Sequence, residues 1–320
     1  MSFRPTARLL AASATALGLL ALANHVVARR SEARRPPRGR FVQVDGLRLH
    51  VIEHGTDRPG PPVVLLHGNG AMAEDFALSG IVGSLARHHH VLVFDRPGFG
   101  HSDRPRRRIW TAAAQARLIG RALHRLGVDR AVLAGHSWGT LVAMEMALQR
   151  PDQVAALVLM SGYYTPTLRA EVPAFSGPAI PILGDLLRYT LSPLLGLAIA
   201  PLLFRRIFAP GPVPAHFAAG FPTGLALRPS QLRAAAADTA LMVPAAMATR
   251  HRHGALPMPV LILAGDGDRI VDVERQSGRL HRDIPGSTLR LLPGAGHMIH
   301  HQAPDAVVRA IRDAAARATA

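Results

Sequence analysis

Ser137 stands in the pentapeptide Gly135-His136-Ser137-Trp138-Gly139, where an apolar strand is expected to turn directly into a helix. The residue at the apex of such a corner takes a strained backbone conformation and points its side chain clear of both elements. Glycines two positions before and after it keep Cβ atoms out of the corner. Strain of this kind costs on the order of 1–3 kcal/mol and usually marks a functional site. Ser137 is therefore a candidate nucleophile.

A serine becomes reactive only with a base, an orienting acid and hydrogen-bond donors for an oxyanion. His297 follows the last expected strand, and Asp266 and Asp268 follow the strand before it. A histidine can take the serine proton, and an aspartate can hold the imidazole in the correct tautomer. The chain order Ser, Asp, His differs from the orders of both chymotrypsin-like and subtilisin-like proteases.

The elements that would carry these residues alternate between strands and helices from Phe41 onward. A β-hairpin is expected around Asp45-Gly46, and helices are expected up to about Arg87, from Thr111 to about Leu126, and over 304–318. Short apolar runs predict buried strands within 61–70, 90–105, 130–137, 154–162, 259–268 and 287–297. This alternation implies an α/β fold with a mainly parallel sheet and helices on both faces. In such sheets active residues gather at the carboxyl ends of the strands.

Further motifs stand at expected strand ends, in the order His67-Gly68-Asn69-Gly70, Asp95-Arg96-Pro97-Gly98-Phe99-Gly100-His101-Ser102, the pentapeptide around Ser137, Gly265-Asp266-Gly267-Asp268 and Gly296-His297. With these motifs the chain resembles the α/β-hydrolase family over essentially all of residues 41–320. The resemblance implies the α/β-hydrolase fold, with a mainly parallel central sheet, helices on both faces and a helical cap insertion. The core would comprise residues 41–162 and 257–320, and the cap residues 163–256.

The resemblance also assigns roles to individual residues. The family places its acid three residues after the strand-end glycine, which is Asp268 here, with Asp266 in reserve. A second position at which the family can carry its acid corresponds to Ser161 in this chain, and a serine cannot act as the acid. The implied catalytic triad is Ser137, Asp268 and His297. The implied oxyanion donors are the backbone N–H groups of Asn69 and Trp138. The expected substrate contacts are Gly68, Tyr163 and Tyr164.

Asn69 and Trp138 also look like the two residues whose side chains hold halide in haloalkane dehalogenases. Dehalogenation and epoxide hydrolysis both use an aspartate nucleophile, because the ester intermediate needs a carboxylate. Position 137 is a serine, which argues against both reactions. We therefore expect the Trp138 side chain to form part of the pocket wall.

The cap sequence is strongly apolar between residues 178 and 214. Pro193 and Pro201 interrupt this stretch, so no run is expected to reach the length of a membrane span. Two interpretations remain open. The apolar residues pack as ordinary cap helices on the core, or they line a substrate tunnel that opens at a membrane surface.

The N-terminal segment from Leu9 to Ala28 contains 20 residues without a charge. As a helix it would span about 30 Å, the thickness of a bilayer core. We expect an uncleaved membrane anchor in a bacterial cell envelope, followed by a basic linker up to residue 40. The alternative is a signal peptide cleaved near Ala21-Leu22-Ala23, which would leave a secreted or periplasmic protein. The arginines after residue 28 argue against cleavage, because such a cluster resists export.

The net charge of +16 raises the question of a nucleic-acid partner. Residues 1–40 contribute +7 of it, and all 37 basic residues are arginine. An arginine-only composition is typical of a GC-rich genome, and no nucleic-acid-binding motif accompanies the charge. We expect no nucleic acid as a partner. The chain has no cysteine, which excludes disulfides and thiolate metal sites. No metal and no organic cofactor are expected.

These observations predict a serine hydrolase that forms an acyl-enzyme on Ser137. The expected substrate is a small apolar or lipid-like carboxylic ester, because it would bind beneath an apolar cap. The same triad also serves hydrolysis of carbon–carbon bonds and cofactor-free perhydrolysis, and fold alone does not choose among these reactions. A non-catalytic binding protein is a further alternative, although it would have no need of a complete triad.

Overall fold

The computed structural model describes residues 4–167 and 169–318. The strands are β1 (Arg40–Val44), β2 (Leu47–His54), β3 (Gly60–Leu66), β4 (His89–Phe94), β5 (Ala131–His136), β6 (Val154–Met160), β7 (Val260–Gly265) and β8 (Thr288–Leu292). The helices are α1 (Arg4–Arg34), α2 (Ala73–Leu78), α3 (Ile81–Leu85), α4 (Ala112–Arg125), α5 (Trp138–Gln149), α6 (Glu171–Ser176), α7 (Leu183–Tyr189), α8 (Leu191–Phe208), α9 (Ala215–Gly220), α10 (Thr223–Ala226), α11 (Pro229–Thr249), α12 (Arg279–Asp283), α13 (Ile299–Gln302) and α14 (Pro304–Arg317). Short 3-10 helices are η1 (Pro151–Gln153), η2 (Gly177–Ala179) and η3 (His253–Ala255), and η4 (Glu274–Gly278) is a short π-helix.

The strands form one sheet in the order β1-β2-β4-β3-β5-β6-β7-β8. β1 pairs with β2, and β2 with β4, in antiparallel fashion, and the remaining neighbours are parallel. The predicted mainly parallel sheet is thus confirmed. The predicted hairpin is also present, and its two turn residues, Asp45 and Gly46, have φ values of 54° and 74°. Positive φ at both turn positions is what a tight two-residue hairpin requires.

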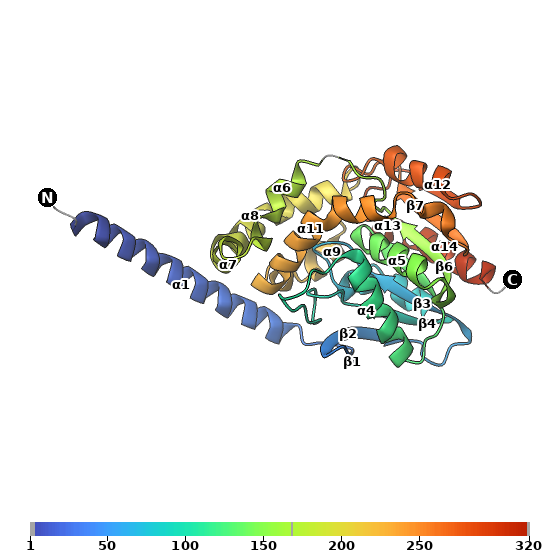
Figure 1. Cartoon of the computed structure of the whole chain (residues 1–320), viewed down its shortest axis with the longest axis horizontal. Coiled ribbons are helices and arrows are strands. Elements are labelled where there is room, and N and C mark those ends of the chain that lie inside the picture. Colours follow the sequence, from blue (N-terminus) through green and yellow to red (C-terminus); the bar gives the residue numbers. More distant parts are fainter. Residues whose placement is uncertain (1–3, 168, 319–320) are drawn as a thin grey trace.

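Helices cover both faces of the sheet, as the sequence predicted (Figure 1). Along β3, Val64 and Leu66 pack with α4 and α5, whereas Val63 and Leu65 pack with α2, α3 and α14. Successive side chains of a strand point to opposite faces, so one apolar strand contributes to both cores. The helix expected up to about Arg87 is instead divided into α2 and α3 at Gly80, whose φ is 81°.

Residues 163–256 lie between β6 and β7 and contribute helices α6 to α11. The expectation that Pro193 and Pro201 interrupt the apolar cap segment is wrong, because α8 runs unbroken from Leu191 to Phe208. Pro193 lies in the first turn, where the missing N–H has no intrahelical partner to lose. Pro201 lies inside the helix and removes one backbone hydrogen bond, which the helix tolerates. By length and composition, α8 could cross a membrane.

Helix α1 extends away from the body of the molecule (Figure 1). It continues to Arg34, so the first part of the segment predicted as a linker is helical. No glycine or proline interrupts residues 29–34, and the helix ends just before the prolines at 36 and 37. The window Ala11–Arg34 is long and apolar enough to cross a membrane, as a signal sequence or an anchor would be.

Candidate active site

Ser137 occupies the sharp corner between β5 and α5, with φ 51° and ψ −120°. This left-handed conformation is unfavourable for a serine and holds its side chain at the end of the strand. The two glycines of the pentapeptide are sterically required. A Cβ on Gly135 would lie 2.7 Å from the carbonyl oxygen of Gly139, and a Cβ on Gly139 would lie 2.1 Å from that of Leu66.

The structure brings Ser137, His297 and Asp268 together. Oγ of Ser137 lies 3.0 Å from Nε2 of His297, and Nδ1 of His297 lies 2.8 Å from Oδ2 of Asp268. The other carboxylate oxygen of Asp268 accepts the backbone N–H groups of Ile270 at 2.7 Å and Val271 at 3.1 Å. Because the carboxylate accepts the proton on Nδ1, Nε2 is free to accept the serine proton.

Asp266, the reserve acid, lies outside this arrangement. Its side chain is exposed, and its Oδ1 accepts the backbone N–H of Gly294 at 2.8 Å. It makes no hydrogen bond or ion pair with His297 among the described residues. The geometry therefore pairs His297 with Asp268.

The expected oxyanion donors flank Ser137. The N–H of Trp138 opens helix α5, and neither it nor the N–H of Asn69 bonds another described residue. The loop that carries Asn69 lies against the nucleophile, since a Cβ on Gly68 would be 3.1 Å from Cβ of Ser137. Two unpaired N–H groups at a helix N-terminus and an adjacent loop are suited to bind negative charge.

The side chains of the same two residues bond cap helix α11. Nδ2 of Asn69 donates to the carbonyl oxygen of Ala235 at 3.1 Å and to Oγ1 of Thr239 at 2.9 Å. Nε1 of Trp138 donates to the carbonyl oxygen of Asp238 at 2.9 Å. These donors fasten the cap over Ser137, so they are not free to hold a halide ion.

The structure does not bring Tyr163 and Tyr164 into contact with the triad. The hydroxyl of Tyr163 accepts the N–H of Thr167 at 2.7 Å, and its ring packs with Ala246 and Val271. Tyr164 is buried in the main core, and burial raises the pKa of its phenol. The Tyr163 side chain thus packs at the base of the cap, whereas the Tyr164 side chain belongs to the core.

Two cavities lie at the base of the cap, and one of them also borders the loop after Asp268. One, of about 250 Å³, is lined mainly by polar residues that include Asp272 and Arg275. The other, of about 380 Å³, is lined by Val172, Pro173 and Val243 among others. Neither of these two cavities is lined by a triad residue, and Ser137 itself is only partly buried.

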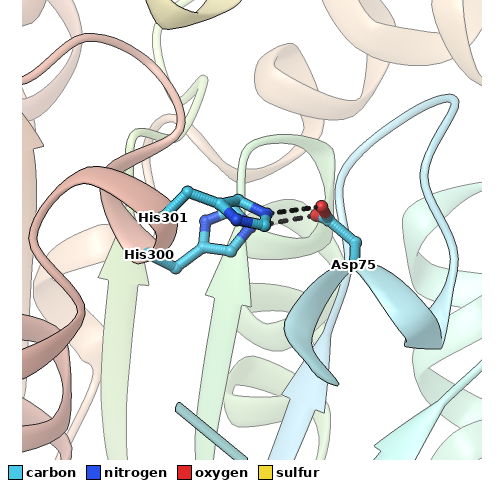
Figure 2. Close-up of side chains that lie close together, drawn as sticks. All are labelled: Asp75, His300 and His301. Carbon is cyan, nitrogen blue, oxygen red and sulfur yellow. Dashed lines mark hydrogen bonds and ion pairs between the residues drawn. The ribbon is translucent and has the colours of Figure 1, made fainter. Parts of the chain in front are cut away.

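A buried cluster of one aspartate and two histidines was not predicted from the sequence (Figure 2). Asp75 on α2 accepts Nε2–H of His300 at 3.0 Å and Nε2–H of His301 at 2.9 Å. Burial alone would raise the pKa of Asp75, but the two histidines outweigh it and hold the pKa below its ordinary value. The three ligand atoms lie within 4.8 Å of one another, so these residues could hold a metal ion. Each carboxylate oxygen of Asp75 instead accepts a ring N–H, whereas Nδ1 of His300 is buried without a hydrogen-bond partner among the described residues.

His136 connects this cluster to the catalytic histidine. Its Nε2 donates to the carbonyl oxygen of His297 at 3.0 Å, and its ring lies 4.5 Å from that of His300. Burial, followed by the two neighbouring histidines, holds the pKa of His136 well below its ordinary value. A neutral His136 thus holds the backbone of the loop that presents His297.

Comparisons with known proteins agree with this architecture. A sequence model described as the alpha/beta hydrolase fold matches residues 61–304. Haloalkane dehalogenase 2 of Mycobacterium bovis is 30% identical over 284 residues, which cover 82% of this chain and 90% of that protein. An uncharacterized hydrolase of Bacillus subtilis, YugF, is 28% identical over 287 residues, which cover 87% and 97% respectively.

Among solved structures, a membrane phospholipase A described as a bacterial virulence factor is similar with a TM-score of 0.66 at 24% identity. The similarity covers 98% of this chain and 97% of that one, and therefore includes most of α1. The residues that match the family model include most of the sheet, the corner at Ser137 and the loops that hold the triad. The chain belongs to the alpha/beta hydrolase family and is a hydrolase of that fold.

Proposed function

We propose that this hydrolase is a membrane-anchored serine esterase that cleaves apolar or lipid-like carboxylic esters. The observation that carries the proposal is the hydrogen-bonded series from Ser137 through His297 to Asp268, in a corner whose two flanking N–H groups are unpaired. Such a series activates a serine for attack on an acyl carbon.

The proposed reaction has two steps. Oγ of Ser137 attacks the ester carbonyl while Nε2 of His297 takes the hydroxyl proton, and that proton then passes to the departing alkoxide. Water hydrolyses the acyl-enzyme by the reverse transfers, which release the carboxylic acid and restore Ser137. The N–H groups of Asn69 and Trp138 would stabilise the oxyanion in both steps.

Similarity to a haloalkane dehalogenase does not extend dehalogenation to this chain. In such a reaction an aspartate forms an alkyl ester, which water can hydrolyse at the carboxyl carbon. Serine attack on an alkyl halide would form an ether, which a triad cannot hydrolyse. The donors of Asn69 and Trp138 are also engaged by the cap.

An apolar substrate is favoured by the cap surface. The large exposed aliphatic residues of α7, α8 and the segment before them, which we call the apolar cap face, are Ile180, Ile182, Leu183, Leu186, Leu191, Leu194, Leu195, Leu197, Leu202 and Leu203. The exposed fraction is 85% for Ile182 and 68% for Leu202. Exposed apolar patches of this kind mark contact with lipid or with a partner, and here α1 extends from the same end of the molecule (Figure 1).

The contacts of α1 favour retention of this helix over cleavage. Asn24 is buried against the cap and donates to the carbonyl oxygens of Tyr189 at 2.9 Å and Thr190 at 2.6 Å. Glu32 forms an ion pair with Arg228 at 2.9 Å. Cleavage near residue 23 would expose the buried amide of Asn24 and free the remaining helix to dissociate.

Hydrolysis of p-nitrophenyl esters of increasing acyl length tests the substrate class. We expect kcat/KM to rise from the acetyl to the octanoyl ester, and Ser137→Ala to abolish turnover at every length. Equal kcat/KM across the series would contradict an apolar acyl site, and turnover by Ser137→Ala would contradict the mechanism.

Fractionation of cells that express the full chain tests the anchor. We expect the protein to stay with membranes after carbonate washing, and its intact mass to include the N-terminal residues. A soluble protein that begins after residue 23 would show that the segment is a cleaved signal.

A further inference from the structure

Arg96, in the loop after β4, is fully buried beside the site. Its Nε donates to the carbonyl oxygen of His67 at 2.8 Å, and its Nη2 donates to that of Gly68 at 3.1 Å. Its guanidinium also lies 4.6 Å from the centre of the Trp138 ring. One side chain therefore touches both segments that supply the oxyanion donors.

The bond to Gly68 has a consequence for Asn69, because the two residues share one peptide unit, which we call the oxyanion peptide. In a trans peptide the C=O and the N–H point in opposite directions. The carbonyl oxygen of Gly68 accepts two donors, Nη2–H of Arg96 and Nδ1–H of His67 at 2.8 Å. Because these donors hold the carbonyl of Gly68 in place, they also hold the N–H of Asn69, which points from the opposite side of the peptide and is unpaired.

The charge on Arg96 makes this fixation stronger than a neutral donor would. A hydrogen bond from a charged donor is about twice as strong as a neutral one, and it polarises the rest of the peptide unit. A rotation of the oxyanion peptide would leave a buried guanidinium donor without its acceptor, which is strongly unfavourable.

Arg96 is itself held by the cap. Oδ2 of Asp238, on α11, accepts Nη1–H of Arg96 at 2.6 Å, and both groups are completely buried. Oδ1 of Asp238 accepts from Arg104 at 2.8 Å. The carbonyl oxygen of Asp238 accepts Nε1–H of Trp138. Movement of α11 away from the core would break these bonds and leave the Arg96 guanidinium without its counterion.

We propose that Arg96, held by Asp238 of the cap, is a positioning residue that fixes the oxyanion peptide. The closed cap is thus part of the catalytic machinery, and the oxyanion hole is fully formed only while α11 covers the site. This inference rests on the proposed acyl-enzyme mechanism, and it assigns to the cap a function beyond substrate binding.

The test compares Arg96→Met with Arg104→Met. Both variants remove a guanidinium group that forms an ion pair with Asp238, but only Arg96 also bonds the oxyanion peptide. We expect Arg96→Met to lower kcat for a p-nitrophenyl ester by about 10²-fold and to change KM less than threefold. The variant would misplace the N–H of Asn69, and an oxyanion donor acts in the transition state. We expect Arg104→Met to keep kcat within threefold, and Asp238→Asn, of the same shape as the native residue, to lower it about tenfold.

Amide hydrogen exchange of the peptide that contains residues 67–70 provides a second measurement, and near-UV circular dichroism confirms that each variant is folded. Exchange should accelerate in Arg96→Met and stay unchanged in Arg104→Met. If Arg96→Met does not fold, Arg96→Lys keeps the charge but loses the two-pronged geometry, and should lower kcat about tenfold.

Two results would overturn the proposal: equal losses of kcat in Arg96→Met and Arg104→Met, or a rise in KM at constant kcat. A wild-type protein that neither hydrolyses esters nor reacts with a fluorophosphonate would instead contradict the proposed function. In that case the exchange measurement still decides whether Arg96 fixes the loop.

Discussion

Replacing Asp268 with asparagine tests the acid of the triad most sharply. Oδ1 of Asp268 accepts the N–H groups of Ile270 and Val271, while Oδ2 accepts Nδ1–H of His297. An asparagine has one acceptor oxygen, which the two backbone donors would keep, because an amide nitrogen cannot accept them. The NH2 group of the asparagine would then face Nδ1 of His297.

The size of the expected loss of kcat follows from the tautomer of His297 that this geometry imposes. Nδ1 must become an acceptor, so the proton moves to Nε2, which lies 3.0 Å from Oγ of Ser137. A ring that carries its proton on Nε2 cannot accept the serine proton. In a Ser-His-Asp triad this error lowers kcat by about 10⁴-fold, which corresponds to about 5 kcal/mol of transition-state stabilisation.

The assay is kcat for p-nitrophenyl butyrate, with Asp266→Asn as the matched control. Asp266 is exposed, and its side chain bonds only the backbone N–H of Gly294 among the described residues, so this variant should keep kcat within threefold. Thermal unfolding should show that both proteins are folded. The reasoning is refuted if Asp268→Asn keeps more than a tenth of kcat, or if Asp266→Asn loses as much.

Three further predictions concern stability. Burial, with a smaller contribution from Arg96, lowers the pKa of His67 from 6.5 to about 4, so below pH 6.5 the unfolded chain binds a proton that the folded chain does not. The stabilisation is therefore complete above pH 6.5 and falls by about 3 kcal/mol as the pH drops to 4; urea midpoints that stay constant from pH 7 to pH 5 would contradict this. Gly139→Ala should lower the free energy of unfolding by about 3 kcal/mol because its Cβ would lie 2.1 Å from a carbonyl oxygen. The control Gly83→Ala, which meets nothing within 4 Å in α3, should be neutral or stabilising by up to about 1 kcal/mol in the same urea titration. Asp75→Asn should cost about 3 kcal/mol, since it removes the charge that two buried histidines share, and a loss below about 1 kcal/mol by urea unfolding would show that the cluster is dispensable.

The elements predictable from the sequence are those whose cause is local. The corner at Ser137 follows from glycines two residues away on either side, and buried strands follow from short apolar runs. The unbroken α8 was not predictable in this way, because proline rules treat Pro201 as a break while packing and the surrounding helix formers decide the outcome.

Unlike the triad, whose members stand in strand-end motifs, two other long-range pairs of residues at the site had no signal in the sequence. Arg96 and Asp238 are 142 residues apart, and Asp75 and His300 are 225 residues apart. Neither pair has a characteristic spacing along the sequence. The first pair forms only when the cap packs on the core, and the second only when the C-terminal loop does so. Arg96 stands within a strand-end motif, but its role becomes interpretable only when its partner Asp238 is known.

Reaction with a fluorophosphonate, followed by mass spectrometry of the labelled peptide, shows whether Ser137 is an activated nucleophile. We expect one covalent adduct on Ser137 in folded, full-length protein, and none in Ser137→Ala or in protein denatured before labelling. Folded protein that remains unlabelled, or that is labelled at another residue while Ser137 stays free, would contradict this expectation.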